Sequence, residues 1–377
     1  MDNTPVLNPE RQKQAKAYSR ISRRLMVLDL LIGFIYCLAW LVFGWSVQLR
    51  TYLTGFTSNE WLLVAGFALV FGGIFLIINL PLSIYEGYIL PHRFGTSTQS
   101  GSGWIVDQFK SLLLGGILGG LVLEIVYAIL RLFPETWWLW ASVFLIVFNV
   151  LLANLAPIIL FPIFNKFTPL GEEHAGLVER LLLLTKRTHT HVQGVYQFDM
   201  SRRTTAANAA LTGLGNTRRI ILGDTLLQEF TADEIETVMA HELGHHVHRD
   251  IPLSILFQSL LTLFGLFLAG EIVQWGVTAF NLQSVSDIAG LPMFILVVGG
   301  YGLITTPIGN AFSRWRERMA DEFALELTGN GKAYASALVR LANQNLAEVD
   351  PEPWVEWLLY SHPALNKRIA MAQSKLD

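Results

Sequence analysis

Three residues in the segment 231–250, two metal ligands and a base, have the types and the spacing of a catalytic metal site. His241 and His245 are four residues apart, so on a helix both imidazoles lie on one face, about one turn apart. Glu242 follows the first histidine directly and can accept a proton from a metal-activated water. The pattern His-Glu-x-x-His therefore predicts one Zn²⁺ ion per chain, with Glu242 as general base.

The segment around these residues is itself predicted to be a helix. Thr231 and Glu234 have the spacing of a capping box at a helix start. An apolar stripe on the side away from the histidines follows the helical period: Ile235, Met239, Leu243 and Val247. Both signals indicate that the two histidines share a helix face.

A catalytic zinc ion needs a third protein ligand, and the segment 309–329 offers one. It is a strong helix former that ends at Gly329, which suits a helix C-terminus. Glu317 and Asp321 share a face of this helix. We expect Glu317 to bind the metal and Asp321 to accept the free imidazole N–H of a ligand histidine. The alternative is a solvated charged face with Arg314, Arg316 and Arg318.

His248 is a competing third ligand on the first helix. A straight helix places it one turn too far from the metal of His241 and His245, and the segment 245–250 has no glycine that could turn the chain back. We therefore interpret His246 and His248 as polar surface residues or as neighbours of the ligands.

The composition indicates an integral membrane protein with a polar insert. Of its 377 residues 52% are hydrophobic and 15% charged, with a mean hydropathy of +0.42, whereas about a quarter of a soluble protein is charged. The single cysteine, Cys37, excludes disulfides within the chain and a cysteine-ligated metal site. A net charge of −3 and the lack of a basic and aromatic groove motif give no sign of nucleic-acid binding.

Six apolar runs are long enough to cross about 30 Å of hydrocarbon. They cover about Leu25–Val47, Trp61–Ile84, Ser111–Phe133, Trp137–Phe161, Ile251–Phe280 and Leu291–Phe312. Lys and Arg gather in the N-terminus, the 93–110 loop, the 163–250 segment and the C-terminal tail, so the positive-inside rule places these parts in the cytoplasm. The predicted metal helix then lies on the cytoplasmic side, at the plasma membrane if the host is prokaryotic.

Five polar residues fall at membrane depth: Asn79, Glu86, Glu124, Asn149 and Asn154. Such side chains usually face the interior of a helix bundle or a watery cavity, because hydrocarbon cannot solvate them. Hydrogen bonding between helices is the alternative, mainly for the asparagines.

The polar insert between the fourth and fifth spans has a mixed pattern. A helix is predicted from Glu172 to about Arg187, a strand over Val192–Asp199, and a β-hairpin around the glycines at 213 and 215. A small sheet beside the metal helix would expose an edge on which an extended peptide could add as a strand.

The metal motif and the second helix together resemble a known family. HELGHH and SRWRERMADEFA resemble the type I CAAX prenyl protease family of membrane zinc metalloproteases and, more distantly, bacterial heat-shock membrane proteases. The resemblance covers nearly the whole chain. YEGYILPHRFGTSTQS is similar to its N-terminal membrane domain, and SHPALNKRI to its C-terminal motif. We divide the chain into an N-terminal membrane domain, 1–162, with four spans, and a zinc metallopeptidase domain, 163–377, with two.

The resemblance implies roles for further residues. It implies that His241, His245 and Glu317 bind zinc, with Glu242 as base and Asp321 behind the ligands. Asn208 and Ala209 match the family's substrate-binding edge strand. His362 and Arg368 match residues that lie near the scissile carbonyl or help to close the site, where a cation or imidazole could stabilise an oxyanion; ordinary capping or surface pairing is the alternative.

The chain departs from the family pattern beside that strand. The family's aromatic residue after Asn-Ala is Ala210 here, the preceding His-Ser is Ala206-Ala207, and we count six spans where eukaryotic members have seven. These differences affect the expected substrate more than the chemistry.

We therefore expect a polytopic α-helical membrane protein of about six spans with a small α+β, gluzincin-like zinc metalloprotease region. The leading function is a CAAX-type metalloendopeptidase that acts on a peptide or membrane-protein substrate in the lipid bilayer. The alternatives are a membrane-protein quality-control protease and, from another class, a non-catalytic zinc-binding membrane scaffold. No obligate protein partner is evident.

Overall fold

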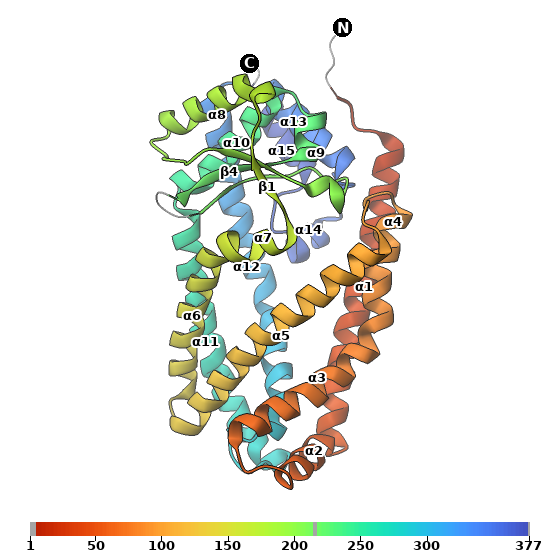
Figure 1. The fold of residues 1–377 in the computed structure, drawn as a ribbon, viewed down its shortest axis with the longest axis vertical. Helices are drawn as coiled ribbons and strands as arrows, with labels where there is room; N and C mark the ends of the chain where they lie inside the picture. The colour runs from red at the N-terminus through yellow and green to blue at the C-terminus, as the bar shows by residue number, and fades with distance from the viewer. Residues whose placement is uncertain (1–4, 214–216, 376–377) are drawn as a thin grey trace.

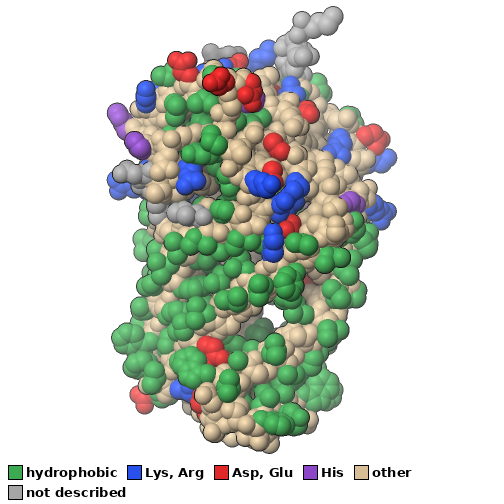
Figure 2. Space-filling model, in the orientation of Figure 1, with side chains coloured by type: hydrophobic (Ala, Val, Ile, Leu, Met, Phe, Trp, Pro, Cys, Tyr) green, Lys and Arg blue, Asp and Glu red, His purple; other side chains and the backbone are tan. Residues whose placement is uncertain are grey.

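A computed structural model describes residues 5–213 and 217–375. Figure 1 shows long helices in one half of the molecule and a small sheet with shorter helices at the other end, where both chain ends lie. Figure 2 shows that apolar side chains cover the surface of the long helices and that charged side chains gather at the end that holds the sheet. This division matches a protein that is embedded in a bilayer and carries a polar region on one side.

Six helical segments of the described chain are long and apolar enough to cross a membrane, which confirms the expected spans. Their main helices are α1 (Pro9–Val42), α3 (Glu60–Ile84), α5 (Gly101–Leu132), α6 (Trp137–Leu155), α11 (Asp250–Ala279) and α12 (Leu291–Thr328). Helix α3 continues through the π-helical turn η1 (Tyr85–Ile89) into α4 (Leu90–Arg93), and the short turn η6 (Ile288–Gly290) precedes α12. The shorter helix α2 (Trp45–Thr54) joins the first two spans.

The ends of these helices differ from the apolar runs. Helix α1 begins 16 residues before its apolar part, because Asn8 caps it and the polar first turns have partners of their own: the Gln12 amide donates to the Ala347 carbonyl at 3.1 Å. Helix α6 ends at Leu155, where a π-helical turn, η2 (Ala156–Leu160), leads into α7 (Phe161–Phe164). Pro157 lies in this turn and has no N–H to continue the helical ladder.

The polar residues at membrane depth have varied surroundings. Asn79 donates from its amide to Asp29 of α1 at 2.8 Å, which joins two spans. The amides of Asn149 and Asn154 instead donate to carbonyls one turn back in their own helix, so the alternative of hydrogen bonds between helices is wrong for these two amides. One carboxylate oxygen of Glu124 is buried without a hydrogen bond.

The polar region is built on a four-stranded sheet in the order β1-β2-β4-β3. Its strands are β1 (Phe167–Pro169), β2 (Val195–Phe198), β3 (Ala209–Thr212) and β4 (Arg219–Gly223). β2 and β4 are parallel, whereas β1 pairs with β2, and β3 with β4, in antiparallel register. The expected hairpin is thus present as β3 and β4, and β3 is an edge strand. Residues 214–216 of its turn lie outside the described residues.

Short helices surround this sheet. They are η3 (Glu172–His174), α8 (Ala175–Arg187), η4 (Met200–Arg202), α9 (Asp224–Glu229), α10 (Ala232–Val247), α13 (Gly331–Gln344), α14 (Pro353–Leu359) and α15 (Leu365–Gln373). Leu181, Leu222, Met239 and Leu243 are buried in one apolar core that joins α8, the sheet and α10. A second core lies among the membrane helices, around Phe67, Tyr127 and Trp137.

Two helices connect this polar region to the membrane part. Helix α10 stops at Val247, and α11 begins at Asp250 after Arg249, which has a left-handed backbone with φ of 55°. Helix α12 runs unbroken from Leu291 to Thr328 and ends at Gly329 with φ of 60°. As expected, both helices that carry the predicted ligands continue into membrane spans.

Candidate metal centre

The three predicted ligands come together in the structure. Thr231 forms the expected capping box with Glu234, so α10 starts as predicted and aligns His241 and His245 on one face. One ligand atom from each of His241, His245 and Glu317 lies within 4.8 Å of the others. The two Nε2 atoms are 3.1 Å apart, and they lie 3.3 and 3.4 Å from the Glu317 oxygens. Ligands at 2.0–2.2 Å from one tetrahedral ion would be about 3.3 Å apart.

Asp321 holds the other nitrogen of the first histidine. Its Oδ1 lies 2.9 Å from Nδ1 of His241, and the residue is fully buried. The Tyr334 hydroxyl donates to the same carboxylate, and Arg368 donates to both of its oxygens, at 2.6 and 2.8 Å. A proton on Nδ1 is thereby fixed, which leaves the Nε2 lone pair for a metal.

Asp250 serves the second histidine in the same way. Its Oδ2 lies 2.7 Å from Nδ1 of His245, and its Oδ1 accepts from Nε of Arg316 at 2.6 Å. The Arg316 guanidinium also donates to the His248 carbonyl at 2.9 Å. Because Asp250 and Arg316 are both buried, the solvated-face alternative for the second helix is wrong at Arg316 as well as at Glu317 and Asp321.

The surroundings of these ligands suit a cation. Oε2 of Glu317 is buried and has no hydrogen-bond partner. Burial alone would lower the pKa of His241, yet the nearby carboxylates of Asp321 and Glu317 outweigh burial and raise that pKa to about 9. The carboxylates thus favour positive charge where the two Nε2 atoms meet, and two neutral imidazoles with one carboxylate form a donor set typical of zinc.

Glu242 and His362 lie beside this group. Burial raises the pKa of Glu242, which brings the carboxylate closer to the range of a base that works near neutral pH. Nε2 of His362 lies 3.3 Å from Oε1 of Glu317, although His362 follows it by 45 positions in the chain. Burial lowers the pKa of His362, so the neutral imidazole is favoured.

The remaining predicted residues lie further from the ligands. Asn208 is exposed and Ala209 begins β3; the carbonyl of Asn208 accepts from the Gly223 N–H at 2.8 Å, so this residue is paired to β4 on its inner side. Arg368 contacts Asp321 and Tyr334, and these contacts favour a positioning role for it over direct contact with a substrate. His248 is outside the ligand group, as expected.

Sequence reasoning missed two residues of the site. Asp250 lies five positions after His245, at the start of α11. An acidic residue so close to the metal motif was a signal in the sequence that could have identified it as a partner of a ligand histidine. Tyr334 lies in α13, and no local pattern connects it with the motif; only the folded packing of α13 against α10 and α12 brings its hydroxyl to 3.2 Å from Nδ1 of His241.

Comparison with known proteins is consistent with this geometry. Residues 173–376 match the model of peptidase family M48, and residues 3–166 match the model described as CAAX prenyl protease N-terminal, five membrane helices. The chain belongs to peptidase family M48. Its family makes it a metalloprotease, and its apolar helices make it a multi-pass membrane protein. In the range 3–166 the described structure has four helices that could cross a membrane, together with the shorter α2. The division of the chain at 162 stays a prediction.

Sequence and structural similarity to known proteins covers most of this chain. The uncharacterized metalloprotease YhfN of Bacillus subtilis is 29% identical over 99% of this chain and 88% of its own. CAAX prenyl protease 1 of Saccharomyces cerevisiae is 32% identical over 78% of this chain and 68% of its own. The crystal structure of S. mikatae Ste24p superposes with a TM-score of 0.84 at 27% identity, covering 98% of this chain and 89% of that one. The membrane part and the polar region therefore share the arrangement of that structure.

Proposed function

We propose that the protein is a zinc endopeptidase whose ion is bound by His241, His245 and Glu317, with Glu242 as general base. The observation that carries the proposal is the convergence of the three ligand atoms around a buried, unpaired carboxylate oxygen. The carboxylates behind both histidines support it, because they fix the tautomer that exposes each Nε2.

A zinc ion held by His241, His245 and Glu317 would supply a Lewis acid for a peptide carbonyl and for the attacking water. Glu242 accepts the proton of the attacking water and delivers it to the leaving amine. His362, whose Nε2 lies 3.3 Å from Oε1 of Glu317, would donate a hydrogen bond to the oxyanion that forms at the scissile carbonyl. Arg368 keeps Asp321 in place and so acts through His241. No covalent acyl-enzyme is required.

The edge strand β3 is the proposed binding site for the substrate backbone. It is the last strand of the sheet and packs against α10, so its outer edge can pair with an extended peptide beside the ligands. Asn208 and Ala209 begin this edge. Hydrogen bonds along it would hold a peptide by its main chain and leave side-chain selection to other surfaces.

For the substrate we propose C-terminal CAAX-type peptides that reach the site from the cytoplasm. The support is the substrate class in the name of the Saccharomyces cerevisiae relative, which is 32% identical to this chain. The distribution of Lys and Arg along the chain supports the cytoplasmic side, and in Figure 1 both chain ends and the sheet lie at the same end of the molecule.

The test is cleavage of a quenched fluorescent peptide by detergent-purified protein, wild type beside Glu242→Gln, with zinc content measured on both. We expect equal zinc and a loss of at least about 10²-fold in cleavage by the variant, because it lacks only the proton acceptor. Equal cleavage by both proteins would refute Glu242 as the base, and absence of zinc from both would refute the metal assignment. Farnesylated and unmodified forms of one CAAX peptide then test the substrate class, and equal rates on both would count against it.

A further inference from the structure

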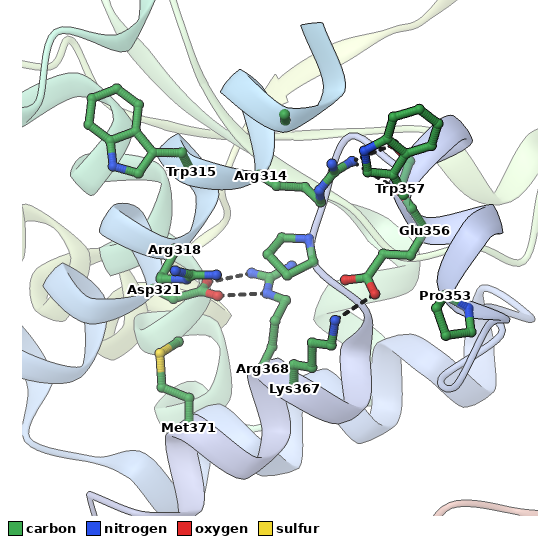
Figure 3. Close-up of a pocket in the computed structure, with 12 residues that line it drawn as sticks. Arg314, Trp315, Arg318, Asp321, Pro353, Glu356, Trp357, Lys367, Arg368 and Met371 are labelled. Carbon is green, nitrogen blue, oxygen red and sulfur yellow. Dashed lines mark hydrogen bonds and ion pairs between the residues drawn. The ribbon is translucent and has the colours of Figure 1, made fainter. Parts of the chain in front are cut away.

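A pocket of about 410 Å³ lies on the outer side of the metal centre, between α12, α14 and α15. Figure 3 shows Trp315 and Trp357 on opposite sides of it, with Arg368 pointing to Asp321 between them. This buried ion pair forms the inner wall of the pocket, and His241 lies against the same Asp321. The pocket is therefore separated from the metal ligands by one layer of side chains.

The pocket carries an excess of positive charge. Four cations line it, Arg314, Arg318, Lys367 and Arg368, against two carboxylates, Asp321 and Glu356. Both carboxylates are already paired, Asp321 with Arg368 at 2.6 Å and Glu356 with Lys367 at 2.6 Å. Burial would raise the pKa of Glu356, but hydrogen bonds from Lys367 and the Ala364 N–H and the charge of Arg314 lower it, so this carboxylate stays ionised. Two positive charges remain without a carboxylate.

The two uncompensated cations are Arg314 and Arg318. Arg314 donates to the carbonyls of Glu356, Trp357 and Tyr360 at the end of α14, which fixes its guanidinium but leaves its charge. Arg318 is exposed and has no hydrogen bond or ion pair with any residue in the described part of the chain. One fixed and one free guanidinium thus border the same pocket.

The exposed residues of α12 and α14 indicate that the pocket lies at the depth of the lipid headgroups. Ile308 is the last exposed large aliphatic residue of α12, and Trp315 follows seven residues, about 10 Å, further along the helix. The indoles of Trp315, Trp354 and Trp357 are all more than half exposed, and exposed tryptophans mark the membrane–water interface. A phosphate one helical turn beyond the hydrocarbon would meet the guanidiniums of Arg314 and Arg318.

We propose that this pocket binds the phosphate group of an acidic phospholipid headgroup. The free guanidinium supplies the charge, and the indoles lie along the glycerol region beside it. The lipid would hold α14 and α15 against α12, and these helices flank His362 and carry Arg368. Acidic lipid is thus expected to stabilise the C-terminal segment that completes the metal centre.

The test measures lipid binding to the detergent-purified protein, independently of any cleavage. Soluble dihexanoyl phosphatidylglycerol, dihexanoyl phosphatidylcholine and inorganic phosphate are each titrated, and binding is followed by native mass spectrometry for the lipids and by competition for phosphate. We expect phosphatidylglycerol to bind at least about tenfold more tightly than phosphatidylcholine, and Arg318→Glu to weaken the former about tenfold or more while leaving the latter unchanged.

Arg24→Glu is the matched control, because Arg24 is an exposed arginine at the start of the apolar part of α1 and does not line this pocket. If Arg318→Glu lowers the unfolding temperature, Arg318→Gln is tested in its place, and we expect it to show a smaller loss of affinity for phosphatidylglycerol. Equal affinity for the two lipids, or equal losses in the Arg24 and Arg318 variants, would overturn the proposal. Inorganic phosphate that binds as tightly as phosphatidylglycerol would identify a site for free anions and overturn the lipid assignment.

Discussion

Asp250 illustrates how far the proposed metal ligands depend on residues behind them. It accepts from His245 with one oxygen and from Arg316 with the other, and its side chain is 9% exposed. We expect Asp250→Asn to weaken zinc binding about 10–100-fold, because a neutral amide no longer supports the basicity of the ligand imidazole. Competition with a chromophoric chelator measures this affinity.

A second effect of the same substitution must be separated from the first. Asp250→Asn leaves the buried Arg316 without a counter-charge, which is expected to cost about 3–5 kcal/mol of folding free energy. The double variant Asp250→Asn/Arg316→Gln should recover most of that stability and keep the weaker zinc affinity. Asp233→Asn, an exposed carboxylate on the same helix as His245, is the control. Unchanged zinc affinity in the Asp250 variant would show that this carboxylate does not support the ligand.

At the residue scale, the sequence predicted which side chains lie together where the spacing along one helix carries the information. His241 with His245, and Glu317 with Asp321, are each pairs separated by four residues, so each pair shares a helix face whatever the rest of the fold does. Tyr334 has no such relation to them. Its contact with Asp321 depends on the angle at which α13 returns over α10, which no local pattern encodes.

At the scale of elements, the crossing of α10 and α12 decides whether two histidines and one glutamate meet. Gly244 lies at this crossing, and a Cβ built on it would be 3.0 Å from the Ala320 Cα and 3.2 Å from both the Ala320 oxygen and the Phe323 ring. Gly244→Ala should therefore push the helices apart, destabilise the protein by about 1–3 kcal/mol and weaken zinc binding. Thermal unfolding and zinc content measure the two effects.

Gly309→Ala provides the comparison for this substitution. Gly309 lies in α12, and a Cβ there would meet no atom within 4 Å, so the change adds only helix propensity, worth up to about 1 kcal/mol in stability. A Gly244 variant that kept wild-type zinc affinity and unfolding temperature would show that the crossing has room to spare and that its spacing does not limit the metal centre.

The helices were predictable from hydropathy and capping signals, but not all of their ends. The apolar run that begins at Leu25 could not show that α1 starts at Pro9, because the partners of its polar turns, such as Ala347, lie more than 300 residues away. Similarly, the short strands were recognisable from the sequence, but their order in the sheet was not. In the sheet β2 pairs directly with β4, although β3 lies between them in the sequence.

For the whole molecule, composition indicated a membrane protein with a polar region, and the structure shows how the two are joined. The loop before α5 pairs with the segment before β3: the Thr98 N–H donates to the Arg203 carbonyl at 3.1 Å, and Arg203 in turn donates to Asp107 of α5. At the opposite end, a buried ion pair of 2.8 Å links Arg50 of α2 to Asp287 before α12. These contacts join distant parts of the chain, so hydropathy and spacing could not predict them.

The metal should stabilise the whole molecule because its ligands lie on extensions of two membrane spans. Helix α10 leads through Arg249 into α11, and α12 carries Glu317 on the same helix that crosses the membrane. An ion that binds only the folded protein adds about 4 kcal/mol of stability when its concentration is about 1,000 times its dissociation constant. A chelator should therefore lower the unfolding temperature of the wild type, measured by tryptophan fluorescence during heating.

The ligand and base variants distinguish this linkage from a general effect of the chelator. Glu242→Gln leaves all three ligands in place, so its unfolding temperature should fall with chelator as the wild type's does. Glu317→Gln removes the buried carboxylate that completes the site, so its unfolding temperature should start lower and respond little to chelator. The same chelator-induced shift in the Glu317 variant and the wild type would mean that the stabilising ion binds elsewhere. Loss of the shift in the Glu242 variant would make that residue a ligand, since a base that only moves protons has no share in metal affinity.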